Sequence, residues 1–147
     1  MNGYFGIGVY HPKYGVNIGT LWRSADIYGA SFIFTIGRRY EKQASDTLKT
    51  WRRIPLWHFA DFDDFHIHMP YNCPLVSVEI GQSHAYSLPT YVHFKRAIYL
   101  LGAEDHGLPS EVIEASHHVV EIPSARCLNV AVAGSIVMYD RFVKGAS

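Results

Sequence analysis

Short runs of apolar, β-branched and aromatic residues recur along the 147-residue chain, separated by turn residues and by longer segments with helix signals. Runs of about four to eight such residues bounded by Gly, Pro, Asn or Asp are typical of buried strands. Longer segments with a capping residue at one end and Gly at the other are typical of helices. The pattern predicts strands over residues 4–10, 31–36, 56–59, 75–80, 96–101 and 119–122, helices over 17–28, 109–116 and 129–143, a short helix opening at residue 61, and a polar, basic connection over 38–53.

The helix ends carry recognisable signals. Asn17 is placed to cap the first helix, which Gly29 would end, and Asn129 is placed to cap the last. Strands that alternate with helices predict an α/β fold with a mostly parallel sheet covered by helices on both faces. We see no repeat, low-complexity segment or linker, so residues 1–147 are expected to form one domain.

The composition narrows the class of protein. With 48% hydrophobic and 18% charged residues, the chain is neither a disordered tail nor a polybasic arm. Cys73 and Cys127 cannot make a disulfide framework, and the sequence has no Cys-x-x-Cys pair. The start lacks a signal-peptide pattern, and the uncharged stretch 127–139 is shorter than the roughly 20 residues that span a bilayer. We therefore expect a cytoplasmic protein with no membrane contact and no metal.

The formal net charge of zero hides an uneven distribution. Residues 1–60 hold eight Lys and Arg against three Asp and Glu, whereas residues 61–147 hold five against ten. The neutral total therefore argues only against binding of nucleic acid through the overall charge of the protein. A local basic face that binds nucleic acid is still compatible with the sequence.

Three segments contain the most unusual residues, in places where parallel sheets bind ligands. In residues 17–25, Arg23 stands on an otherwise apolar helix, either as a snorkelling surface arginine or as a cation aimed at phosphate or a polarised oxygen. In residues 101–109, Gly102 and Gly107 flank two acids and a histidine, which fits a ligand loop or an ordinary polar turn. In residues 122–133, a loop containing Cys127 leads into the last helix.

Together these segments carry three motifs in a fixed order. They read Asn17-x-Gly19-x-x-x-Arg23, then Leu101-Gly102-x-Glu104-x-x-Gly107-Leu108-Pro109, then Ile122-Pro123 followed by Cys127-Leu128-Asn129-Val130-x-Val132-Ala133. The chain thereby resembles the SPOUT superfamily of methyltransferases, in its SpoU/TrmH-like branch, over nearly all of its length. Its short length is similar to the TrmL/YibK-like tRNA wobble-position ribose methyltransferases.

The resemblance implies a fold, a cofactor and an assembly. In this family the C-terminal segment of an α/β domain threads into a deep trefoil knot, and the knot loops bind S-adenosyl-L-methionine between two subunits. A homodimer is therefore expected. Carried over by position, the cofactor-binding residues are Val78, Gly102, Ile122, Cys127 and Leu128.

The implied reaction is methyl transfer to a ribose 2′-hydroxyl of RNA, with a tRNA anticodon-loop (wobble) nucleotide as the expected substrate. The resemblance assigns the catalytic positions to Arg23, Asn17, Glu104 and Asn129. Because the pKa of arginine lies above roughly 12, we expect Arg23 to stabilise negative charge rather than to act as a base. The family often has Ser at the Cys127 position.

Alternatives stay open at this point. They are methylation of ribosomal RNA or of an RNA base, an inactive RNA- or nucleotide-binding module, and a cysteine hydrolase in which Cys127 would pair with His106 or His117.

RNA contacts are expected from two basic segments that also contain aromatic rings. Cations beside stacking rings suit single-stranded bases and phosphates; a solvated basic surface is the alternative. The residues concerned are Arg38, Arg39, Arg52 and Arg53.

Overall fold

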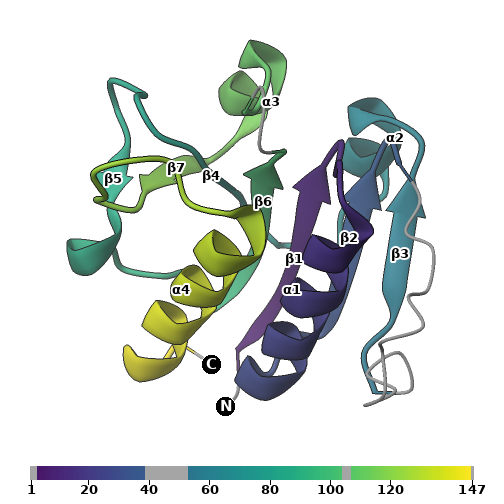
Figure 1. The fold of residues 1–147 in the computed structure, drawn as a ribbon, viewed down its shortest axis with the longest axis horizontal. Helices are drawn as coiled ribbons and strands as arrows, with labels where there is room; N and C mark the ends of the chain where they lie inside the picture. The colour runs from purple at the N-terminus through teal and green to yellow at the C-terminus, as the bar shows by residue number, and fades with distance from the viewer. Residues whose placement is uncertain (1–2, 39–52, 104–106, 147) are drawn as a thin grey trace.

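The strands form one seven-stranded sheet in which every pairing is parallel, as the computed structural model of residues 3–38, 53–103 and 107–146 shows (Figure 1). The strand order is β3-β2-β1-β6-β4-β7-β5. This architecture confirms the predicted α/β fold. The strands are β1 (Tyr4–Tyr10), β2 (Phe32–Ile36), β3 (Leu56–Phe59), β4 (Leu75–Val78), β5 (Tyr86–Ser87), β6 (Arg96–Gly102) and β7 (His118–Glu121).

Helices cover both faces of the sheet. On one face α1 (Gly15–Tyr28) and α4 (Val130–Val143) lie side by side (Figure 1), and the buried Ile7 and Val9 of β1 join their core cluster. On the other face lie α2 (Phe62–Ile67) and α3 (Ser110–Ala115). Since side chains alternate along a strand, β1 presents Gly6 and Gly8 to this second face. A Cβ at either glycine would collide with the ring of Phe32 or Phe34 on the neighbouring strand.

Several predicted boundaries need correction. The first helix begins at Gly15 with Tyr14 at its N-cap position, so the prediction that Asn17 caps this helix is wrong. Asn17 lies one turn inside, with 9% of its surface exposed, and its side-chain oxygen accepts a hydrogen bond from Asn129 at the start of α4. The strand predicted over 75–80 ends at Val78, and the pattern missed β5 and the 3₁₀ turn η2 (Leu88–Thr90).

Two predicted caps are confirmed. The carboxylate of Asp61 accepts a hydrogen bond from the Asp64 N–H at 2.8 Å and opens α2. The Asn129 side-chain oxygen accepts from the N–H groups of Ala131 and Val132 at 2.9 and 3.3 Å and opens α4. Each satisfies backbone donors that the first turn of a helix leaves without partners.

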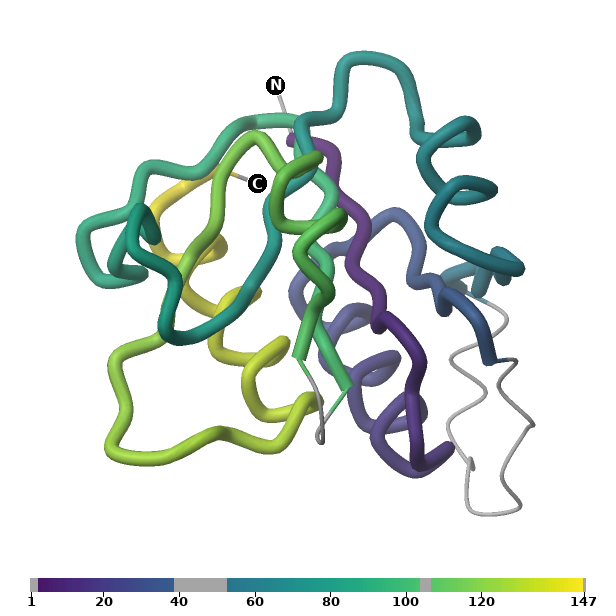
Figure 2. Tube along the Cα trace, turned by 90° about the horizontal axis from the view of Figure 1, so that it is seen from above, coloured from purple at the N-terminus to yellow at the C-terminus, as the bar shows by residue number. Residues whose placement is uncertain are grey.

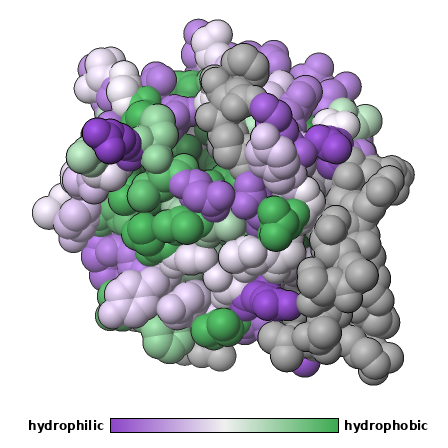
Figure 3. Space-filling view, in the orientation of Figure 1, coloured by the Kyte–Doolittle hydropathy of each residue, from purple (hydrophilic) through white to green (hydrophobic). Residues whose placement is uncertain are grey.

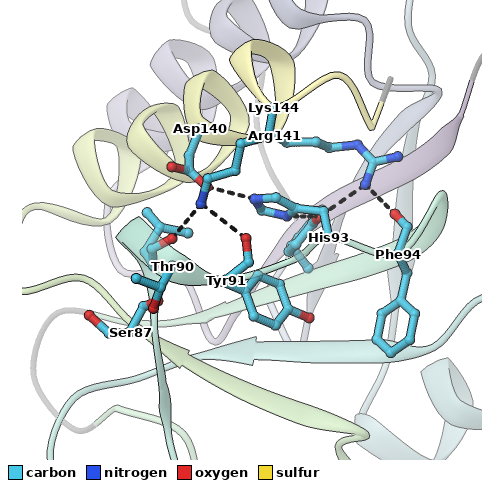
Figure 4. Close-up of polar contacts among 10 residues, drawn as sticks. Ser87, Thr90, Tyr91, His93, Phe94, Asp140, Arg141 and Lys144 are labelled. Atoms are coloured by element: carbon cyan, nitrogen blue, oxygen red, sulfur yellow. Dashed lines mark hydrogen bonds and ion pairs between the residues drawn. The ribbon is translucent and has the colours of Figure 1, made fainter.

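A buried polar network ties the C-terminal end of α4 to the connection before β6 (Figure 4). The guanidinium of Arg141, whose residue has no exposed surface, donates to the carbonyls of Phe94 and Lys95 at 2.6 Å each. It also donates to the Tyr99 hydroxyl at 3.1 Å. The planar fork of arginine suits this task, because a single side chain satisfies several carbonyls at once.

His93 continues this network. Its Nε2 lies 2.7 Å from the Asp140 carboxylate, and its Nδ1 lies 2.7 Å from the Tyr99 hydroxyl. A carboxylate only accepts, so the arrangement assigns the proton of neutral His93 to Nε2, with Tyr99 donating to Nδ1. Burial lowers the pKa of His93, against the opposing effect of Asp140. Lys144 completes the network by donating to the carbonyls of Leu88 and Tyr91 and pairing with Asp140.

No helix among the described residues combines the length and apolar character needed to cross a membrane.

Candidate cofactor site and catalytic face

A cavity of about 400 Å³ lies at the carboxyl ends of β4, β6 and β7. Its volume falls within the range of roughly 300–1,000 Å³ typical of small-ligand sites. The segment between β7 and α4 bounds the cavity, and Figure 2 shows it as a wide loop that leaves the end of β7 and returns to the start of α4. The structure brings together all the residues predicted to bind a cofactor, and the lining includes Val78, Gly102, Ile122, Cys127 and Leu128.

The part of the cavity wall formed by Gly102, Ala103, Gly107 and Leu108 depends on glycine. Ala103 and Gly107 form an antiparallel bridge, and the Gly107 N–H donates to the Ala103 carbonyl at 3.3 Å. A Cβ on Gly102 would lie 2.7 Å from the Gly107 carbonyl carbon, so the two backbones approach too closely for any side chain there. Gly107 has a φ of +64°, a conformation that glycine adopts without strain. At Gly102 and Gly107, backbone atoms rather than side chains therefore form the wall of the cavity.

One acidic side chain, Glu79, lies in the cavity wall, and the sequence analysis did not select it. Its Oε2 accepts from the Leu108 N–H at 2.7 Å, and its Oε1 accepts from the Ile80 N–H at 3.0 Å. The signal was present in the sequence, because Glu79 interrupts the apolar run that was interpreted as one strand over 75–80.

Two predicted catalytic residues meet across the helix pair. The Asn129 amide donates to the Asn17 side-chain oxygen at 3.0 Å, while the Asn129 oxygen caps α4. This contact joins α1 to the end of the cavity loop. Glu104, which was also predicted to be catalytic, lies outside the described residues.

Arg23 occupies a different side of α1. Six residues separate it from Asn17, which corresponds to about 9 Å along the helix axis and about 120° around it. Accordingly Asn17 is buried against α4, whereas Arg23 is exposed. Arg23 lies in one stripe with Val16, Thr20 and Ile27, so a partner that covers this stripe would also cover the arginine.

Of the predicted RNA-binding arginines, the two that the structure describes, Arg38 and Arg53, do not lie together. Arg38 follows the carboxyl end of β2 and donates to the Lys13 carbonyl at 2.6 Å. Arg53 precedes the amino end of β3 and pairs with Asp26 at 2.9 Å. Because β2 and β3 are parallel, these two arginines lie at opposite ends of the strands. Arg38 lies at the carboxyl edge of the sheet, where the parallel strands end, and Arg53 lies at the amino edge, where they begin. Arg39 and Arg52 lie outside the described residues.

The structure contradicts the pairing of Cys127 with His117 that a cysteine hydrolase would need, because these two residues lie far apart. Cys127 is exposed and lines the cavity at the carboxyl edge of the sheet. His117 accepts from the backbone N–H of Leu75, the first residue of β4, and therefore lies at the amino edge. His106 lies outside the described residues, which contain no group of three or more His, Cys, Asp or Glu able to hold a metal ion.

Several known structures share this fold. An AdoMet-bound rRNA methyltransferase from Sinorhizobium meliloti matches with a TM-score of 0.83 and 23% identity, over 95% of this chain and 56% of that one. The structure solved for the 2-OH methylation of C/U34 on tRNA matches with a TM-score of 0.79 and 24% identity, over 97% and 98%. A TrmH/SpoU tRNA modifying enzyme from A. aeolicus gives 0.83 and 17%, over 99% and 79%.

These likenesses establish the fold, and the chain spans little more than half the length of the Sinorhizobium structure. A search of the curated proteins gave no match. Family membership follows from a separate comparison, since the model of the SpoU rRNA Methylase family matches residues 5–139, which include all three motifs. The chain therefore belongs to the SpoU rRNA Methylase family.

Proposed function

We propose that the protein is an S-adenosyl-L-methionine-dependent RNA methyltransferase that modifies a ribose 2′-hydroxyl, with a tRNA anticodon-loop nucleotide as its substrate. The observation that carries the proposal is the cavity at the carboxyl ends of β4, β6 and β7. Its lining contains all five residues that the family resemblance assigns to the cofactor, in a chain that the family model matches from residue 5 to 139.

The cavity fits the chemistry of this cofactor. Apolar side chains such as Leu101, Leu108 and Val130 offer surface to a planar adenine, and the glycine-rich wall brings backbone donors and acceptors close. The Glu79 carboxylate adds negative charge near a ligand that carries a sulfonium cation. When bound, S-adenosylmethionine supplies an activated methyl group.

The chain's own residues would hold and activate the acceptor. Arg23 would stabilise the negative charge that develops on the ribose oxygen and the charge of the adjacent phosphate, while the hydroxyl proton passes to solvent. The hydrogen bond between Asn17 and Asn129 would keep α1, which carries Arg23, in a fixed position against the start of α4. RNA is distinguished from DNA because DNA lacks the acceptor hydroxyl.

A homodimer is part of the proposal, and the outer faces of α1 and α4 support it. Hydrophobic residues gather over the first half of α4 and the loop before it in Figure 3. Along α1 and α4, exposed apolar residues recur at helical spacing, so each helix presents a stripe. The stripes contain Val16 (62% exposed), Ile27 (70%), Val132 (45%), Tyr139 (54%) and Val143 (56%). A second copy seated there would cover them together with Arg23.

The decisive experiment is incubation with labelled S-adenosylmethionine and total tRNA, followed by nucleoside analysis. We expect label in a 2′-O-methylated nucleoside. Label only in methylated bases would overturn the ribose assignment, and absence of label on any RNA would favour an inactive binding module. Light scattering of the purified protein tests the dimer, and a monomer would contradict it.

Ribosomal RNA is the second candidate substrate, and the name of the matching family favours it. The same labelling assay with ribosomal RNA distinguishes the two. The trefoil knot, the single-domain organisation and the cytoplasmic location remain predictions from the sequence.

A further inference from the structure

Glu79 uses both oxygens of its carboxylate to join two separate loops of the cavity wall. Oε1 accepts from the Ile80 N–H at 3.0 Å, in the loop after β4, and Oε2 accepts from the Leu108 N–H at 2.7 Å, in the loop before α3. These backbone groups are 28 residues apart in the sequence, and both Ile80 and Leu108 line the cavity. Hydrogen bonds to an ionised acceptor are about twice as strong as neutral ones.

The surroundings of Glu79 are built to receive its carboxylate. A Cβ on Gly107 would collide with Oε2, so glycine at this position admits the carboxylate beside the loop. The backbone of Glu79 is itself fixed, since its N–H donates to the Val120 carbonyl of β7 at 3.0 Å. The side chain therefore extends from a rigid strand end to a loop whose path requires glycine.

A second carboxylate on the neighbouring strand holds the same turn from the other side. Oε1 of Glu121, the last residue of β7, accepts from the Gly81 N–H at 2.9 Å. Gly81 has a φ of +76°, a conformation that glycine adopts without strain.

We propose that Glu79 is a positioning residue for the cofactor cavity, whose carboxylate clamps the loop at Gly107–Leu108 to the loop at Ile80 and thereby sets the shape of the site. The identity of the ligand rests on the proposed function, whereas the clamp itself rests on the contacts above. Glu79 acts through the backbone of the two loops.

Glu79→Gln tests the clamp. Glutamine has nearly the same size but one accepting oxygen, so one of the two backbone N–H groups would face an amide donor and lose its partner. We expect the amide of Leu108 or Ile80 to exchange with solvent about tenfold faster in the ligand-free protein, a factor that corresponds to about 1.4 kcal/mol. S-adenosylmethionine should bind about tenfold more weakly in calorimetry.

Two matched variants show whether the effect of Glu79→Gln comes from the lost hydrogen bond or only from the lost negative charge. Glu121→Gln keeps a side-chain oxygen that can accept from the Gly81 N–H. Its effect on amide exchange and on cofactor binding should therefore be smaller than that of Glu79→Gln. Glu114→Gln removes an exposed carboxylate of α3 outside the cavity lining and should leave exchange and binding within about twofold of the parent.

Unchanged exchange at both Leu108 and Ile80 in Glu79→Gln would overturn the clamp, and so would equal effects of all three glutamine variants. If Glu79→Gln does not fold, Glu79→Ala provides the same test, because it removes the carboxylate without placing an amide donor against the two backbone N–H groups. Faster exchange at Leu108 and Ile80 in Glu79→Ala supports the clamp, and unchanged exchange at both overturns it. If the parent protein binds no S-adenosylmethionine, the proposed function fails, while exchange in the ligand-free protein still decides the clamp.

Discussion

The amino edge and the carboxyl edge of the sheet differ in which groups form them and in how deeply these groups are buried. At the amino edge, Arg141 is completely buried, and its guanidinium binds the carbonyls of Phe94 and Lys95 within a network of side chains. At the carboxyl edge, backbone groups and glycines form the wall of an open cavity, and Cys127 is exposed. Buried side-chain hydrogen bonds are thus concentrated at one end of α4, whereas the loops at its other end are left available for a ligand.

Arg141→Met should break the amino edge and is expected to have the largest effect. The variant leaves the buried carbonyls of Phe94 and Lys95 without their donor, and it removes a cation stacked 4.8 Å from the ring centre of Phe5. We expect a loss of about 3–5 kcal/mol in the free energy of unfolding, measured by urea denaturation.

The matched control is Arg126→Met, since Arg126 is exposed in the loop before α4. It should change the free energy of unfolding by less than about 0.5 kcal/mol. Equal stability losses for the two variants would mean that the buried network is not what stabilises the amino edge.

Arg23→Ala tests the proposed catalytic role of Arg23 and changes no residue of the buried network at the amino edge. If this exposed arginine stabilises charge in the transition state, methyl transfer should fall at least about 100-fold, while calorimetry still detects cofactor binding. Thermal unfolding should remain close to that of the parent. Parallel loss of binding and transfer would mean that Arg23 has a structural role.

The amino edge should also make stability depend on pH. Burial lowers the pKa of His93 in the folded protein, so below about pH 6.5 the unfolded chain takes up a proton that the folded chain resists. The free energy of unfolding should therefore decline as the pH falls from about 6.5 toward the lower folded pKa, with a slope of at most about 1.4 kcal/mol per pH unit.

Urea denaturation at a series of pH values checks this dependence, and His93→Gln should flatten it. Exposed His84 supplies the control, since His84→Gln should keep the parent slope. His118, whose pKa burial also lowers, adds a contribution of the same sign that remains in both variants. A slope in His93→Gln equal to that of the parent would contradict the assignment.

Asn129→Ala should cost less stability than Arg141→Met, and it tests a contact at the carboxyl edge. It removes the cap of α4 and the contact to Asn17, so we expect a loss of about 1 kcal/mol in the free energy of unfolding together with slower methyl transfer. Asp61→Ala removes the cap of α2 and should cost similar stability with methyl transfer retained. Retained transfer in Asn129→Ala would limit Asn129 to capping.

The fold was largely predictable because local signals agreed with the tertiary arrangement. Apolar runs such as residues 4–10 and 96–101 became central strands, whose neighbours on both sides bury them. The pattern failed at β5, which pairs with β7 over only two residues and exposes both. Such an edge element depends on what it packs against and has no periodicity of its own.

The site was predictable only in part. The motifs selected Gly102, Ile122 and Cys127, and the structure places them in one cavity. They also selected Asn17 as a catalytic position, whereas the helix pattern wrongly made it the cap of its own helix. Nothing in local sequence could indicate that its partner is Asn129, because this hydrogen bond depends on how α1 packs against α4.

Neighbouring residues and their spacing were enough to predict most of the helices and strands, the parallel sheet, and the three motifs that mark the family. The burial of Arg141, the joining of two cavity loops by Glu79, and the separation of Arg38 from Arg53 became visible only in the folded chain. A charged side chain acquires its role from the dielectric and the hydrogen-bond partners around it, and distant segments supply both on folding.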